Sequence, residues 1–96
     1  MTEETFVEYS GIHLASSEVT FLNNLEQELG KPIPHVAAQQ HLTFGFTSKK
    51  NHISGLGLYR QRLHVLPESI GNLVNLEILI LEDNQISLLP ETFGNL

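Results

Sequence analysis

The sequence contains no cysteine and no tryptophan, and its basic residues are few. Without cysteine the chain can form no disulfide, no thiolate metal site and no cysteine nucleophile, and this composition fits a reducing compartment. Five Lys and Arg stand against 11 Asp and Glu, and residues 1–50 and 51–96 are each net acidic. Neither half offers the basic surface that phosphate contacts require, so we expect no nucleic-acid ligand.

Long hydrophobic runs are also missing. No stretch approaches the roughly 18 apolar residues that span a membrane. The first ten residues, MTEETFVEYS, carry acids where a secretory signal carries bases followed by an apolar stretch. We therefore expect a cytoplasmic protein without membrane contact, and 96 residues leave room for one small domain.

What the sequence does contain is a repeat of fixed period. LPESIGNL, at residues 66–73, returns 23 positions later as LPETFGNL, at residues 89–96. The alignment extends over residues 53–73 against 76–96, and its identical pairs include Leu56 with Leu79, Leu58 with Leu81, and Pro67 with Pro90. A fixed period in this range predicts a solenoid built from stacked turns.

Each period begins with the pattern of a short strand. In LEILILEDN, Leu79 and Leu81 are two residues apart and fall on one face of the strand. Ile78, Ile80 and Glu82 then point to the other face. The predicted strand thus has an inner face for the core and an outer face for solvent or a partner.

After the strand, each period turns and returns through a short helical segment. Asn84 stands at the turn, where its amide can donate to and accept from unpaired backbone groups of neighbouring turns. Gln61 occupies the same position in the first copy and has a longer, looser reach. Pro67 and Pro90 suit the first position of the helical return, and the following Gly-Asn pairs end it.

These residues resemble the leucine-rich repeat, LxxLxLxxNxL, in its 23-residue form with LPxxIGNL on the return. The repeats are similar to those of Ras-group-related and of archaeal or bacterial leucine-rich-repeat proteins. The resemblance implies an α/β solenoid with a short parallel sheet on its concave face and helical turns on its convex face. We expect this segment to span 51–96, with repeats at 53–75 and 76–96.

Residues 1–50 are expected to form an N-terminal cap. Apolar residues at helical spacing predict a helix over about 17–29, capped by Ser16 or Ser17 and ended by Gly30. In HLTFGFT, residues 41–47, apolar and small or polar residues alternate, and SKKN supplies a turn. This pattern predicts a hairpin whose first strand lies at about 41–47 and whose second strand begins the first repeat.

The C-terminal end of the predicted array leaves two alternatives open. Phe93 and Leu96 are apolar residues expected at the open end of this array. Either the chain is a piece of a longer array, or the open end self-associates with another copy, because an exposed strand edge above a bare core promotes association.

Residues able to carry catalysis form no familiar pattern. The sequence contains neither HExxH nor a G-x-S-x-G elbow. No two of its histidines lie at i, i+4 on a predicted helix. They are His13, His35, His41, His52 and His64. We therefore expect no enzyme, no catalytic residue, no metal site and no cofactor. A small metal-dependent hydrolase that uses the cap histidines remains an alternative.

The outward side chains of the two predicted strands are the candidate binding surface. They are Gly55, Gly57 and Tyr59 from the first strand and Ile78, Ile80 and Glu82 from the second. An apolar centre bordered by the charges of Arg60, Glu82 and Asp83 resembles a protein-binding patch. The predicted partner-binding residues are Tyr59, Arg60, Ile78, Ile80 and Glu82.

The function expected from this surface is non-catalytic protein–protein interaction. The resemblance to Ras-group-related repeats implies a signalling scaffold whose partner is a small GTPase or another signalling protein. The alternative is a structural fragment that caps a longer repeat array and has no ligand of its own.

Overall fold

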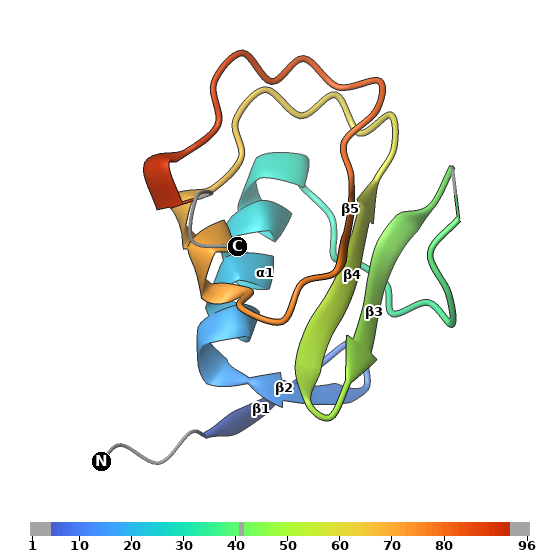
Figure 1. Ribbon diagram of the computed structural model, residues 1–96, viewed down its shortest axis with the longest axis vertical. Coiled ribbons are helices and arrows are strands. Elements are labelled where there is room, and N and C mark those ends of the chain that lie inside the picture. The colour runs from blue at the N-terminus through green and yellow to red at the C-terminus, as the bar shows by residue number, and fades with distance from the viewer. Residues whose placement is uncertain (1–4, 41, 93–96) are drawn as a thin grey trace.

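The computed structural model describes residues 5–40 and 42–92 (Figure 1). In chain order its elements are the strands β1 (Phe6–Tyr9) and β2 (Ile12–Ala15), the helix α1 (Ser16–Leu29), the strands β3 (Phe44–Lys49) and β4 (His52–Leu58), the 3-10 helix η1 (Glu68–Asn72) and the strand β5 (Ile78–Ile80). The strands form two sheets, β1-β2 and β3-β4-β5. Figure 1 shows α1 beside the three-stranded sheet and the β1–β2 hairpin across one end.

The fold is not the leucine-rich-repeat solenoid that the sequence predicts. It is a small α/β domain with one α-helix and two small sheets in the described residues, and it is not a repeat solenoid. Its larger sheet is mixed, because β3 pairs antiparallel with β4, and only the three-residue β5 pairs parallel with β4. Two periods provide too few neighbours for a stacked core, so α1 and β3 supply the burial instead.

The helix α1 occupies Ser16–Leu29, against the predicted 17–29, and buries the apolar face formed by Val19, Phe21, Leu22 and Leu25. The expected serine cap is absent, because Ala15 holds the N-cap position and no side chain bonds there. Gly30 ends the helix with φ 75°, and its N–H donates to Glu26 O at 2.7 Å. Within the described ranges, no helix combines the length and the hydrophobicity that crossing a membrane requires.

Two tight hairpins frame the helix. Ser10 and Gly11, between β1 and β2, both have positive φ, as do Lys50 and Asn51 between β3 and β4. Two-residue turns of this kind match the twist of paired strands. The β3–β4 turn falls within the predicted SKKN segment, whereas the β1–β2 hairpin was not expected from the sequence. Asn51 Nδ2 donates to His13 O at 2.9 Å and ties the two hairpins together.

One hydrophobic core runs through both segments that the sequence analysis separates. The first segment contributes fully buried side chains from β2, α1 and β3, and the second contributes others from β4, η1 and the loops around them. The predicted boundary at residues 50 and 51 lies in the turn between β3 and β4. The core includes Leu14, Phe21, Leu22, Leu25, Phe46, Ile53, Leu56, Leu58, Ile70 and Leu73.

The two copies of the repeat run side by side beyond β4 and β5, as the two arcs at the top of Figure 1 show. Asn84 joins them. Its Nδ2 donates to Leu58 O at 2.6 Å and to Leu81 O at 3.1 Å, and its Oδ1 accepts the N–H groups of Gln61 at 3.1 Å and Leu63 at 2.9 Å. The side-chain amide of Asn84 therefore provides hydrogen-bond partners for backbone groups of both arcs.

We expect Asn84→Ala to lower the free energy of unfolding by about 1–3 kcal/mol, because partly buried backbone donors and acceptors lose their partner. Asn84→Asp should also destabilise the protein, since a carboxylate cannot donate to Leu58 O. Urea unfolding checks both, with the exposed Asn75→Ala as the matched control. Equal midpoints for Asn84→Ala and Asn75→Ala would contradict the assignment.

Candidate functional site

The outer side of β5 holds the apolar part of the predicted surface. Ile78 is 47% exposed and Ile80 is partly buried. The parallel register places them beside Gly55 and Gly57 of β4. Glu82 follows the strand and is exposed. The structure thus brings the two isoleucines onto one face of the sheet, next to two residues without side chains.

The glycines themselves are covered by the protein's own chain. A Cβ atom at Gly55 would lie 2.5 Å from Thr47 Oγ1 and 2.7 Å from Gln39 Cγ, and one at Gly57 would lie 2.5 Å from Gln39 Oε1 and 2.6 Å from Thr43 O. The glycines allow this close approach. The β4 half of the predicted surface is therefore closed, and the β5 half remains open.

A charged rim lies at the end of the two strands. Arg60 Nη2 is 3.1 Å from Asp83 Oδ2, and the guanidinium lies 5.3 Å from the centre of the Tyr59 ring. The N–H of Arg60 donates to Glu82 O at 3.1 Å. Arg60 and Asp83 are both exposed, so their ion pair adds little to stability. It presents both signs of charge beside the isoleucines.

The residues predicted to be structural divide between the two copies. Leu56 and Leu58 are fully buried, whereas Leu79 and Leu81 are only partly buried. Pro67 directly precedes η1, and Pro90 precedes the last described turn of the second copy. Gln61 Nε2 donates to Tyr59 O at 2.8 Å, and its Oε1 is buried with no hydrogen-bond partner in the described part of the chain.

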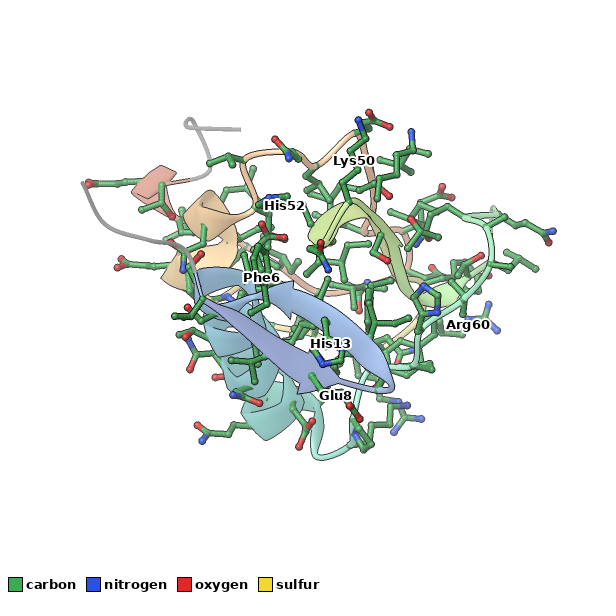
Figure 2. All side chains as sticks on the ribbon, turned by 90° about the horizontal axis from the view of Figure 1, so that it is seen from below. Phe6, Glu8, His13, Lys50, His52 and Arg60 are labelled. Atoms are coloured by element: carbon green, nitrogen blue, oxygen red, sulfur yellow. The ribbon has the colours of Figure 1, made fainter. Side chains whose placement is uncertain are left out.

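The four histidines that the structure describes do not converge. His13 and His64 are exposed, and the His35 ring lies 5.2 Å from that of Phe46. In Figure 2 the labelled His13 and His52 come from different elements, and His41 lies outside the described residues. Over residues 5–40 and 42–92, no three His, Asp or Glu side chains form a group that could hold a metal ion.

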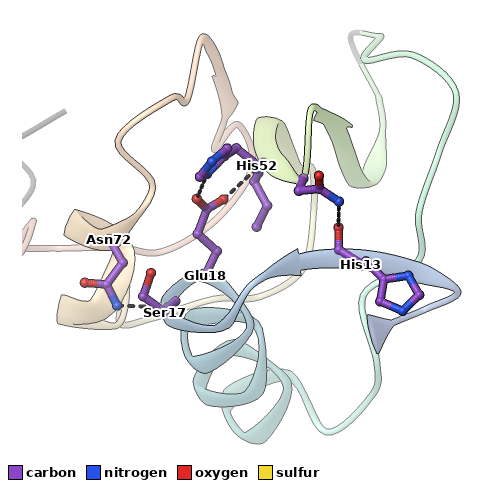
Figure 3. Close-up of polar contacts among 7 residues, drawn as sticks. His13, Ser17, Glu18, His52 and Asn72 are labelled. Atoms are coloured by element: carbon purple, nitrogen blue, oxygen red, sulfur yellow. Dashed lines mark hydrogen bonds and ion pairs between the residues drawn. The ribbon is translucent and has the colours of Figure 1, made fainter. Parts of the chain in front are cut away.

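His52 belongs instead to a polar contact that the sequence analysis missed. Glu18, 1% exposed in the first turn of α1, accepts the N–H of Ile53 on Oε1 at 2.6 Å, and its Oε2 lies 2.6 Å from His52 Nδ1 (Figure 3). A carboxylate near a helix N-terminus is favoured by the helix dipole. Glu18 and His52 are 34 positions apart, and only the packing of α1 against β4 brings them together.

The imidazole ring of His52, which Glu18 holds in place, lies at the edge of a cleft. The cleft has a volume of about 480 Å³, and its polar walls include Lys49, Lys50, Ser54 and Glu77. Lys49 Nζ pairs with Glu77 Oε1 at 3.0 Å, and Ser54 Oγ donates to Thr47 Oγ1 at 3.2 Å. Lys49 and the Ser54 hydroxyl thus already have partners within the protein. The geometry supports a structural role for the Glu18–His52 contact, which anchors α1 to the start of β4.

Tyr9 forms a second buried polar contact. Its hydroxyl donates to Glu26 Oε1 at 2.6 Å and accepts the N–H of Ile33 at 3.0 Å. Burial raises the pKa of Tyr9 to about 12, and the hydrogen bond to Glu26 adds to the rise. The N–H of Ile33 acts in the opposite direction. This tyrosine remains neutral and joins β1, α1 and the loop after the helix.

We expect Glu18→Ala to lower the free energy of unfolding by about 2–3 kcal/mol, because the N–H of Ile53 and the His52 ring lose a charged partner. Glu18→Gln retains an acceptor and should cost less. Thermal and urea unfolding measure both losses, and Glu28→Ala, on the exposed side of the same helix, is the control. A loss no greater than that of Glu28→Ala would refute the anchoring role.

The raised pKa of Tyr9 predicts a pH-dependent stability. Between pH 10.0, the ordinary pKa of tyrosine, and about pH 12, the unfolded chain releases the phenolic proton while the folded chain retains it. The stabilisation from Tyr9 is thus complete below about pH 10 and is lost as the pH rises through about 12. Tyr9→Phe should cost about 1–3 kcal/mol at neutral pH, and the difference from wild type should narrow above pH 10. Urea unfolding at several alkaline pH values tests this, and a constant difference would contradict it.

Comparison of the chain with protein-family models, with curated proteins and with solved structures gives no match. The site is therefore defined by its own geometry. The feature of that geometry best suited to binding is the open apolar strip of β5 beside its charged rim.

Proposed function

We propose that this chain is a non-catalytic protein-binding domain and that its partner docks on the outer side of β5. The observation that carries the proposal is the exposure of Ile78. This β-branched side chain is 47% exposed on the edge strand of a sheet whose opposite face builds the core. Such exposure has a cost in water that burial against a partner would remove.

The surroundings of Ile78 support this proposal. Ile80 lies on the same face, two residues further along β5. Arg60, Asp83 and Tyr59 border the isoleucines at the strand ends. An apolar centre with a polar rim that contains arginine and tyrosine is the usual organisation of protein interfaces. The predicted Glu82 extends the acidic part of the rim.

The sequence resemblance of the repeat supplies the class of partner. Its similarity to Ras-group-related leucine-rich repeats favours a small GTPase or another signalling protein, and we propose a partner of this class. The acidic composition argues against nucleic acid. A cytoplasmic location, which agrees with the cysteine-free sequence, also belongs to the proposal.

The test compares the wild-type chain with the triple variant Tyr59→Ala, Ile78→Ala and Ile80→Ala. A partner captured by immobilised wild-type protein is identified and purified, and its dissociation constant is measured for both chains. We expect the triple variant to bind at least about thirtyfold more weakly, as removal of a hot-spot cluster of about 2 kcal/mol would require.

Phe6→Ala is the matched control. Phe6 is also an apolar strand residue and is 48% exposed, but it lies on β1 in the other sheet. Its substitution should leave the affinity unchanged. If the triple variant folds and binds every captured protein as tightly as wild type does, the outer side of β5 is not the binding surface. A purely structural role would then account for the chain better.

A further inference from the structure

The strand β5 has a free edge. Glu77, just before the strand, donates its N–H to Ser54 O on β4 at 2.8 Å. Alternate residues of a strand direct their backbone groups to the same side. Leu79 therefore faces β4, and Ile78 and Ile80 direct their N–H and C=O groups away from it. Over the described ranges no strand pairs with this side, because β5 is the last strand of the order β3-β4-β5.

The core beside this edge is incompletely covered. Where both members of a pair are described, the inward position of the first copy is buried and its equivalent in the second copy is partly or largely exposed. Leu66 is buried, for example, while Leu89 is 52% exposed and the adjacent Leu88 is 82% exposed. An open hollow of about 240 Å³ lies here, and its apolar walls are Leu81, Ile86, Leu88 and Leu89. The free edge and the bare core lie at the same end of the molecule.

We propose that a second copy of this chain covers that end, with β5 pairing antiparallel to β5 of the other copy about a two-fold axis at Leu79. In this register Ile78 lies opposite Ile80 of the second copy. Both residues direct their N–H and C=O groups outward, so each such pair exchanges two backbone hydrogen bonds. Leu79 then lies opposite its own counterpart in a non-hydrogen-bonded pair. The pairing joins two three-stranded sheets into one.

The local sequence favours a second copy as the occupant. The segment Ile78–Leu79–Ile80 has the same sequence in both directions. A two-fold pairing therefore places apolar side chains beside apolar side chains on both faces of the sheet. Each end of β5 also carries an ion pair, Lys49–Glu77 at the start and Arg60–Asp83 beyond the end. An antiparallel pairing brings the start of one strand beside the end of the other. The Lys49–Glu77 pair of one copy then lies near the Arg60–Asp83 pair of the second copy, so that each acid has a base of the other copy nearby.

This inference is separate from the proposed function. Edge pairing leaves the outward side chains of β5 exposed, and it places the isoleucines of both copies in one continuous patch. Mass in solution tests the dimer, and affinity for a captured protein tests the partner surface. Either result can fail without affecting the other.

Sedimentation equilibrium of the 96-residue chain should give twice the 10.8 kDa mass of the monomer. Two double variants then test the register. Ile78→Lys with Ile80→Lys, and Ile78→Glu with Ile80→Glu, each place like charges opposite one another and should weaken self-association at least about tenfold. An equimolar mixture of the two variants should restore a dimer, because opposite charges then face each other.

Two further variants complete the test. Ile80→Pro removes an outward N–H, leaves the bonds to β4 in place and should give a folded monomer, as judged by circular dichroism. Phe6→Lys, on the other sheet, should remain a dimer. A wild-type chain that is monomeric throughout the micromolar range would overturn the proposal. So would a folded Ile80→Pro variant that dimerises like wild type, or a charge-variant mixture that stays monomeric.

Discussion

The structure depends on the complete enclosure of β4. This strand pairs with β3 on one edge and with β5 on the other, and every residue from Ile53 to Leu58 is buried. Leu56 and Leu58 reach into the core, while Gly55 and Gly57 allow the segment around Gln39 and Thr43 to lie against the opposite face. A side chain at either glycine would separate that segment from the sheet. The remaining elements are arranged around this strand.

Polar side chains connect these elements, and each does so by satisfying backbone groups. Glu18 bonds the N–H of Ile53 and so links α1 to β4. Tyr9 bonds the N–H of Ile33 and links β1 to the loop after the helix. Asn84 bonds groups of both repeat arcs. A buried polar group without a partner costs more than a single hydrogen bond contributes, so these three contacts favour one arrangement of the chain over other compact ones.

The two copies of the repeat have different surroundings, and this difference gives the molecule a closed and an open end. The first copy packs against α1, through contacts such as Asn72 Nδ2 to Ser17 O at 2.9 Å, and against β3. In the described residues, the second copy lies beside the first, and Lys49 of β3 pairs with its Glu77. Leu79 and Leu81 are only partly buried and Leu89 is exposed, whereas their equivalents in the first copy are buried. The strand of the second copy also keeps a free edge. Both the proposed partner surface and the proposed dimer follow from this asymmetry.

Local pattern in the sequence indicated the helix, the β3–β4 turn, the pairing of Leu56 with Leu79 and the position of Asn84, because each depends on periodicity or on backbone chemistry within a few residues. The Ser10-Gly11 turn, with alternating residues on either side, is a similar local signal for β1 and β2. The solenoid was a wrong extrapolation, since repetition of sequence does not specify how many neighbours each turn will have. Only the tertiary structure decided that α1 and β3 enclose β4, that Gln39 covers the glycines and that Glu18 meets His52. These contacts join residues far apart in the chain, and the free energy of burial that selects them depends on the whole packed core.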